Sequence, residues 1–172
     1  MNWFKFIYKV VFFKKKIMHR TVLNLIQIQS EIKEKILELN LKNYNPEIIA
    51  VSKTFKIDHI VNLINFGHQH YGENKVQEAM DKWANIKERN KLIKLHMIGK
   101  LQTNKVKSAV KIFDYIHSVD NNKLAKKISE ENSKQNKNVK IFIQVNIANE
   151  EQKSGVSLNA LGKLIEDCKN LK

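Results

Sequence analysis

The feature that most constrains the fold is an alternation of short apolar runs with helical patterns along most of the chain. The apolar runs lie near residues 48–52, 69–72, 95–99, 115–119 and 140–146, at intervals of about 20 to 26 residues. Continuous apolar runs of this length are typical of strands that are covered on both faces. Strands and helices that alternate at this spacing predict a parallel α/β sheet, either doubly wound or closed as a (β/α)8 barrel.

Helical patterns occupy the intervals between these runs. They are expected over residues 58–66, 74–87, 104–110, 121–134 and 157–171, and a further amphipathic helix at 21–41 precedes the first strand. Gly67 is expected to end the first of the five. Asn74 and Gln77 have the spacing of a capping box, and Asp120 and Ser157 stand where N-caps are expected. Each strand is therefore followed by a helix.

A barrel is favoured over a doubly wound sheet because no strand is followed by the Gly-rich turn of a dinucleotide-binding unit. A complete (β/α)8 barrel needs about 250 residues, whereas this chain of 172 residues provides five strand–helix units and a leading helix. The predicted fold class is a TIM-barrel type, truncated to about five βα units. An open arc leaves two sheet edges unpaired, so we expect marginal stability or association unless a partner closes it.

Residues 1–17 differ from the rest, since they contain five lysines, six aromatic residues and no acidic residue. Their longest apolar run, residues 10–13, is too short to span a bilayer, and no signal-peptide cleavage site follows it. A membrane-touching segment and an extra ordered element are two alternatives. We interpret residues 1–17 as an N-terminal extension and residues 18–172 as a partial barrel domain.

The formal net charge of +14 raises nucleic acid and anionic membranes as partners. Only Arg20 and Arg89 are arginines, however, and arginine is the residue that contacts phosphates and bases bidentately. The lysines are scattered along the chain, which is typical of a solvated surface. We therefore expect no nucleic-acid partner and no stable membrane insertion, with a basic nucleic-acid or membrane-surface binder as an alternative.

No metal site is predicted from the histidines, cysteine or acidic residues. Cys168 is the single cysteine, which excludes an internal disulfide and a cysteine-built metal site and fits a reducing cytoplasm. His68 and His70 share a strand face, but no third ligand has the spacing to complete a site with them. Glu73 and Glu78 are explained by the favourable position of acids at a helix N-terminus.

Lys53 is the residue with the most interesting position, because a barrel places its reactive groups at the carboxyl ends of its strands. Lys53 is expected to share a strand face with Ile49 and Val51, so that its amine emerges from an apolar wall. Such a wall favours the uncharged amine that a Schiff base with an aldehyde requires. The chain has 29 lysines (31 Lys and Arg, of which two are Arg), so an ordinary surface lysine is the alternative.

Several segments also match the motifs of one protein family in order and spacing. They are residues 50–54 (AVSKT), 72–78 (GENKVQE), 96–105 (HMIGKLQTNK), 117–120 (HSVD), 144–146 (QVN) and 153–155 (KSG). Together they resemble the pyridoxal phosphate homeostasis protein family, small relatives of the alanine racemase barrel. The resemblance runs from about Met18, the family's usual start, to the C-terminus. Lys75 departs from it by standing where the family has Tyr, and the block at 96–105 is highly specific.

The resemblance implies that Lys53 holds pyridoxal 5′-phosphate (PLP) as a Schiff base and that Asn74 lies beside this cofactor. His96 and Asn146 are further cofactor-binding candidates by the same carry-over. The implied function is intracellular PLP homeostasis in the cytoplasm, without an established reaction of the protein's own. PLP and PLP-dependent client enzymes are the implied partners.

The family's later strands and its Ser/Thr- and Gly-rich phosphate loop are missing after Lys172, so we expect weak PLP retention. A PLP-dependent racemase or decarboxylase of related fold, acting through Lys53, is an alternative. It would require an additional β domain and an acid/base partner opposite the cofactor. A truncated product without function is a further alternative.

Overall fold

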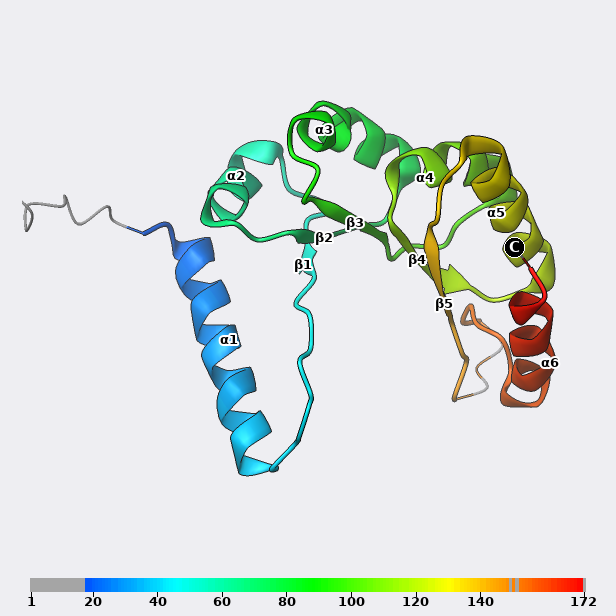
Figure 1. Ribbon diagram of the computed structural model, residues 1–172, viewed down its shortest axis with the longest axis horizontal. Helices are drawn as coiled ribbons and strands as arrows, with labels where there is room; N and C mark the ends of the chain where they lie inside the picture. Colours follow the sequence, from blue (N-terminus) through cyan, green and yellow to red (C-terminus); the bar gives the residue numbers. More distant parts are fainter. Residues whose placement is uncertain (1–17, 149, 151, 172) are drawn as a thin grey trace, which may run out of the picture. The chain divides into compact units, whose positions relative to one another are not determined.

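The chain divides into two compact units, residues 1–45 and residues 46–172. A computed structural model describes residues 18–148, 150 and 152–171 (Figure 1). The first unit contains helix α1 (Arg20–Glu38), which confirms the leading helix predicted at 21–41. The predicted extension at 1–17 lies outside the described residues, and the domain boundary near Met18 stays a prediction.

The second unit is built on a five-stranded parallel sheet. Its strands are β1 (Ala50–Val51), β2 (His70–Glu73), β3 (Lys94–Met97), β4 (Tyr115–Val119) and β5 (Lys140–Ile143). They lie in sequence order, and each pairs in parallel with the next. Consecutive order is the arrangement of a barrel, whereas the strand order of a doubly wound sheet reverses. The predicted fold class is therefore confirmed.

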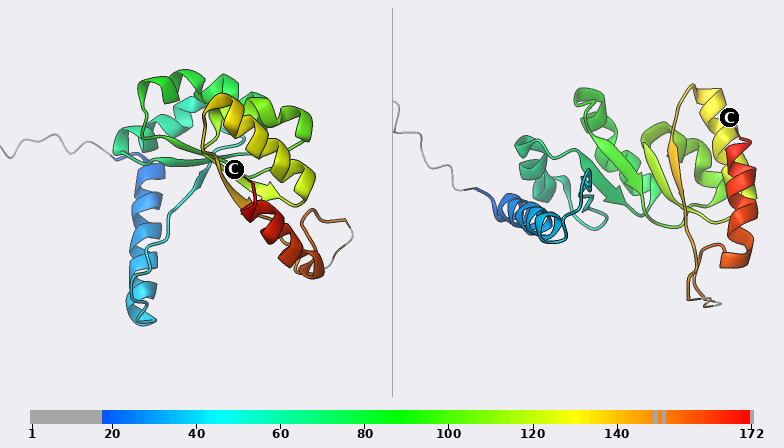
Figure 2. Two further views of the ribbon diagram at one scale, coloured as in Figure 1. Left: turned by 45° about the vertical axis from the view of Figure 1, so that its right-hand side comes forward. Right: turned by 60° about the horizontal axis from the view of Figure 1, so that its bottom comes forward.

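Helices cover one face of this curved sheet (Figures 1 and 2). They are α2 (Ile57–Phe66), α3 (Val76–Arg89), the 3-10 turn η1 (Thr103–Lys105) with α4 (Val106–Ile112), α5 (Asn122–Gln135) and α6 (Leu158–Lys169). Helix α3 packs beside α4, α4 beside α5, and α5 beside α6. The other face of the sheet is left as a concave inner face, which carries part of the site described below.

Local sequence signals account for some of the helix ends. Gly67 ends α2 in the left-handed conformation with φ of 97°, as predicted. Asn121 caps α5 by accepting a hydrogen bond from a backbone N–H of its first turn. The capping box predicted at Asn74 and Gln77 is wrong, because Lys75 is the N-cap of α3 and makes no side-chain cap bond.

The main core lies between the sheet and the helices that cover it. The largest fully buried side chains include Trp83, Tyr71, Ile93, Leu95, Met97, Ile116 and Leu124. They belong to one continuous apolar cluster, in which the rings of Tyr71 and Trp83 have centroids 4.7 Å apart. Each large apolar side chain buried in this way contributes about 1.5–3 kcal/mol to stability.

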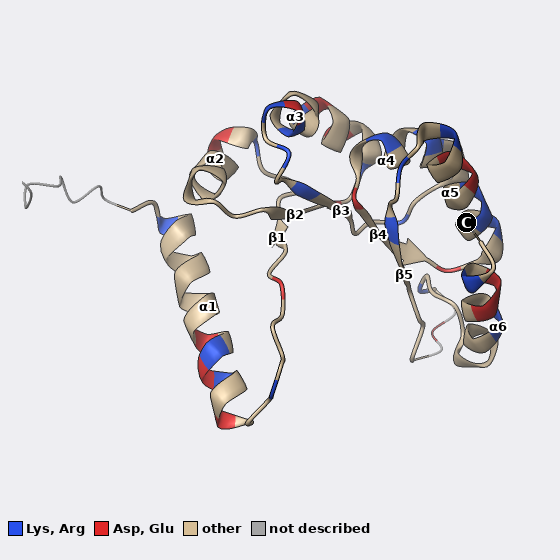
Figure 3. Ribbon diagram, in the orientation of Figure 1, with Lys and Arg blue, Asp and Glu red and all other residues tan. Residues whose placement is uncertain are grey.

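Charged residues of both signs are interspersed over the helices (Figure 3). Several form ion pairs within one turn, as between Lys75 and Glu78 and between Lys127 and Glu130. This distribution agrees with the interpretation of the basic excess as a solvated surface. Among the residues that the structure describes, no helix combines the length and apolar character needed to cross a membrane.

We predict that Leu95→Ala lowers the free energy of unfolding by about 2–5 kcal/mol, because Leu95 is fully buried in β3 and its loss leaves a cavity. The change can be measured by urea denaturation. Leu92→Ala is the matched control, since Leu92 is 62% exposed just before the same strand and its loss should change stability by less than about 0.5 kcal/mol. Equal effects of the two substitutions would contradict this description of the core.

Candidate functional site

The carboxyl ends of β1, β2 and β3 bring three of the family-like segments together at one edge of the sheet. The backbone N–H of Ser52 donates to the carbonyl of Gly72 over 2.9 Å. The N–H of Ile98 donates to the carbonyl of Glu73, also over 2.9 Å. The loops that follow the three strands therefore start side by side, as barrel geometry requires of a site.

Two of these loops approach each other so closely that one position must be glycine. A Cβ atom on Gly99 would lie only 2.9 Å from the Cα of Asn74 and 3.0 Å from its carbonyl carbon. Such distances are well inside van der Waals contact, and both atoms belong to backbone that cannot rotate away. Gly99 therefore fixes the loop after β3 against Asn74, which is half-buried at the head of the loop before α3.

Lys53 lies two residues beyond β1 and is exposed. It lines a groove of about 540 Å³ formed by the loop at 53–58 and by Glu78, Asp81 and Lys82 of α3. The predicted apolar wall around its amine is wrong, because β1 ends at Val51 and the chain turns at Lys53 and Thr54. Its position at the carboxyl end of the first strand is as predicted.

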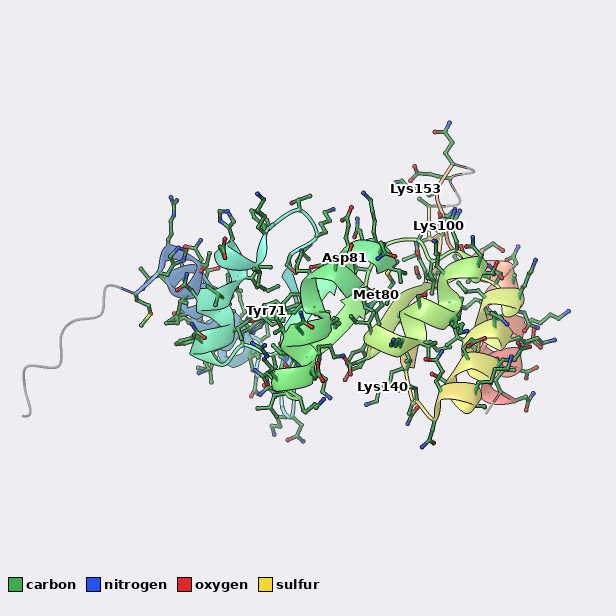
Figure 4. All side chains as sticks on the ribbon, turned by 90° about the horizontal axis from the view of Figure 1, so that it is seen from above. Tyr71, Met80, Asp81, Lys100, Lys140 and Lys153 are labelled. Carbon is green, nitrogen blue, oxygen red and sulfur yellow. The ribbon has the colours of Figure 1, made fainter. Side chains whose placement is uncertain are left out.

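Asn146 lies on the loop after β5, where its side chain organises the loop itself. Its Nδ2 donates to the carbonyl of Glu150 over 2.8 Å, and its Oδ1 accepts the N–H of Glu150 over 3.3 Å. The loop borders a cavity of about 580 Å³ that is also lined by Lys100 and Lys153. Figure 4 shows these two lysines at the same edge of the unit, while Lys140, at the start of β5, lies at the opposite edge.

His96 is the middle member of a row of three histidines, His70, His96 and His117, on the concave inner face of the sheet. Nδ1 of His70 lies 2.9 Å from Nε2 of His96, and Nδ1 of His96 lies 2.9 Å from Nε2 of His117. The ring of His96 stacks on Tyr115 with a centroid distance of 4.4 Å, and His117 stacks on Phe142 at the same distance. Both ring nitrogens of His96 are therefore engaged within the protein.

Two members of the row, His96 and His117, favour the uncharged ring. Burial, followed by the neighbouring His117 and His70, lowers the pKa of His96 from 6.5 to about 4. Burial also lowers the pKa of His117. The carboxylate of Glu47, at the outer end of the row, lies 3.7 Å from Nε2 of His70. An uncharged ring has one N–H, so His96 donates to one neighbour and accepts from the other.

A buried polar cluster lies on the opposite face of the same strand ends. Glu73 is fully buried, and its Oε1 accepts hydrogen bonds from Ser52 Oγ at 2.7 Å, Lys82 Nζ at 2.8 Å and Trp83 Nε1 at 2.9 Å. The sequence interpretation of Glu73 as an acid at a helix N-terminus is therefore wrong. Glu73 ends β2 and lies two residues after Tyr71, so the two side chains share a strand face and both point toward the helix layer.

The structure thus separates the four predicted site residues. Lys53 and Asn74 lie at neighbouring strand ends, His96 lies within the sheet, and Asn146 lies on the loop after β5. Their roles toward a cofactor stay predictions. Sequence reasoning missed His117 as a partner of His96, because only the register of β3 against β4 brings the two together.

Fold and site together define a parallel-strand barrel protein with a lysine directly after its first strand. The family model described as the alanine racemase N-terminal domain matches residues 29–172. The chain belongs to this family.

Individual relatives confirm the resemblance found in the sequence. The chain is 32% identical over 148 residues to a pyridoxal phosphate homeostasis protein of Pasteurella multocida, covering 86% of this chain. It is 31% identical over 142 residues to the protein of that name in Escherichia coli, covering 82% of this chain. It spans only 64% and 61% of the lengths of these two relatives.

Solved structures show the same likeness. PipY of Synechococcus elongatus, solved with PLP bound, is 30% identical, with a TM-score of 0.67 over 81% of this chain and 64% of PipY. The same protein without PLP gives a TM-score of 0.69. Alanine racemase of Clostridium difficile, at 14% identity and a TM-score of 0.59 over 77% of this chain and 35% of that one, shows the fold alone.

We predict that Gly99→Ala destabilises the protein by about 1–3 kcal/mol, because the added methyl group forces two backbone segments apart. Thermal or urea unfolding measures the change. Gly162→Ala in α6 is the control: no atom lies within 4 Å of its Cβ position, so alanine should stabilise the helix by about 0.5–1 kcal/mol. A neutral Gly99→Ala would contradict the close approach to Asn74.

We also predict that acid destabilises the protein through the histidine row. The pKa of His96 is lower in the folded state than in the unfolded state. The unfolded chain therefore binds a proton at this residue below pH 6.5, whereas the folded chain binds it only near pH 4. Stability is therefore complete above pH 6.5 and is lost as the pH falls toward 4, by up to about 1.4 kcal/mol per pH unit for one proton.

The slope of unfolding free energy against pH, from urea titrations between pH 7 and 4, tests this prediction. His96→Gln should flatten the slope by up to one proton, whatever its effect on stability at pH 7. His59→Asn, which replaces an exposed histidine of α2, should leave the slope unchanged. An unaltered slope in His96→Gln would show that the row does not resist protonation.

Proposed function

We propose that the chain forms part of a PLP-binding site in intracellular PLP homeostasis and that PLP attaches to Lys53. The observation that carries the proposal is the position of Lys53, directly after the first strand of a barrel, within the AVSKT segment. A relative of known structure, PipY, was solved with PLP bound. The name of the curated relatives, pyridoxal phosphate homeostasis protein, supports the same function.

The residues at this edge of the sheet suit such a ligand. Lys53 makes no hydrogen bond or ion pair with any residue that the structure describes, so its exposed amine is free to react. When bound, PLP supplies an aldehyde, which condenses with a lysine amine with loss of water. Asn74 offers an amide at the next strand end, and Lys100 supplies positive charge in the cavity beside Asn146, where Lys153 is paired with Glu150.

The three other candidates would then act in different ways. Asn74, fixed by Gly99, would contact the ligand from the loop after β2. His96 would support the inner face through the histidine row, because both of its nitrogens are already engaged. Asn146 would hold the shape of the loop that carries Lys153.

We infer further that the protein acts as a carrier, which binds PLP and delivers it to PLP-dependent client enzymes in the cytoplasm. The homeostasis name shared by the curated relatives supports this role. An assay of alanine racemisation separates a carrier from an enzyme. Turnover that is lost in Lys53→Ala would overturn the carrier role while leaving the site in place.

Titration of the purified chain with PLP, followed by borohydride reduction and mass spectrometry, tests the site. Wild type should show the adduct mainly on Lys53, and Lys53→Ala should lose at least nine-tenths of it. Lys56→Ala is the matched control, since Lys56 lines the same groove three residues later and should leave the adduct unchanged. Labelling spread evenly over many lysines would contradict the proposal.

A further inference from the structure

A buried cluster of Ser52, Glu73 and Lys82 fixes the backbone immediately before Lys53 through hydrogen bonds. Nζ of Lys82 donates to the carbonyl oxygen of Ser52 over 2.7 Å as well as to Oε1 of Glu73 over 2.8 Å. The hydroxyl of Ser52 donates to the same carboxylate oxygen over 2.7 Å. The hydroxyl and the carbonyl of Ser52 are therefore bonded to β2 and α3 respectively, immediately before Lys53.

The same carbonyl also defines the turn beyond Lys53. The backbone N–H of Phe55 donates to the carbonyl oxygen of Ser52 over 3.0 Å, which closes a turn around Lys53 and Thr54. Lys82 therefore bonds to the acceptor on which this turn is built. These bonds add to the pairing of β1, which is only two residues long, and to the bond from the Ser52 N–H to the Gly72 carbonyl.

The cluster is costly to build, which points to a role that simple packing would not fill. Glu73 has no exposed side-chain surface and Lys82 only 14%, and removing two charges from water carries a large desolvation penalty. Oε2 of Glu73 has no hydrogen-bond partner among the described atoms, so the carboxylate depends on the donors to Oε1. An apolar residue pair could fill the same space without this penalty.

A second lysine of α3 provides a natural comparison. Lys87 contacts Asp114, just before β4, at 2.5 Å and donates to the carbonyl of Ile112, the last residue of α4, over 2.8 Å. Its side chain is 21% exposed, close to the value for Lys82. The two lysines are five residues apart on one helix, but Lys82 contacts the carboxyl end of the sheet and Lys87 the amino end.

We propose that Ser52, Glu73 and Lys82 are positioning residues for Lys53. They hold the Ser52 carbonyl and the following turn, so that the backbone of Lys53 presents its side chain from one place at the strand end. The inference rests on the proposed function of Lys53. It adds the reason why PLP would react with this lysine in preference to the other 28.

The test compares Lys82→Met with Lys87→Met, each of which removes one buried charge from α3 and keeps the length of the side chain. With PLP and borohydride, Lys82→Met should lower the ratio of adduct on Lys53 to adduct on other lysines at least tenfold. Lys87→Met should keep the wild-type ratio. Circular dichroism and urea titration confirm that each variant is folded under the labelling conditions.

Hydrogen exchange at the amide of Phe55 gives a second readout that needs no PLP. Exchange should become at least tenfold faster in Lys82→Met and stay unchanged in Lys87→Met, because only Lys82 bonds to the acceptor of that amide. If wild type does not select Lys53, the proposed function fails. The exchange comparison then still decides whether the cluster holds the turn.

Two further variants keep the test decisive if Lys82→Met does not fold. Ser52→Ala removes one bond to Glu73 and leaves the ion pair, and it should lower the labelling ratio about threefold. Lys82→Arg keeps the charge and the donors, and it should restore most of the ratio. Wild-type ratios and exchange rates in Lys82→Met, or equal losses in Lys82→Met and Lys87→Met, would overturn the proposal.

Discussion

The buried carboxylate of Glu73 is the constraint on which the site end of this fold depends. A carboxylate without access to water is tolerated only when donors surround it. Those donors come from Ser52, immediately after β1, and from Lys82 and Trp83 of α3. Hydrogen bonds to Oε1 of Glu73 therefore join the end of β2 to helix α3 and to the residue that follows β1. The loop that carries Lys53 begins at this point.

The sheet assigns different chemistry to its two faces. Its outer face is apolar except for the Glu73 cluster, and it packs against α3, α4 and α5. Its inner face carries the histidine row, stacked against Tyr115 and Phe142. The alternation of side chains along each strand makes this separation possible, because neighbours in sequence point to opposite faces.

Much of the fold could be predicted because periodicity and spacing are local properties, and α2 and its cap at Gly67 followed directly from them. Less of the site could be predicted from the sequence. Glu73 was misassigned because it stands just before a helix, whereas it ends β2 and is buried. The apolar wall predicted around the Lys53 amine is absent among the described residues because β1 ends at Val51, before the alternation of side chains reaches Lys53. The contact between His96 and His117 depends on strand register, which no single segment encodes.

The histidine row has a consequence for where its protons can reside. Because uncharged His96 donates to one neighbour and accepts from the other, the hydrogen bonds run either from His70 toward His117 or in reverse, and His96 cannot reverse alone without placing two N–H groups or two lone pairs face to face. The tautomers of the three rings are therefore coupled. A change of hydrogen-bond partner at His70, beside Glu47, would be transmitted across three strands to the far side of the inner face.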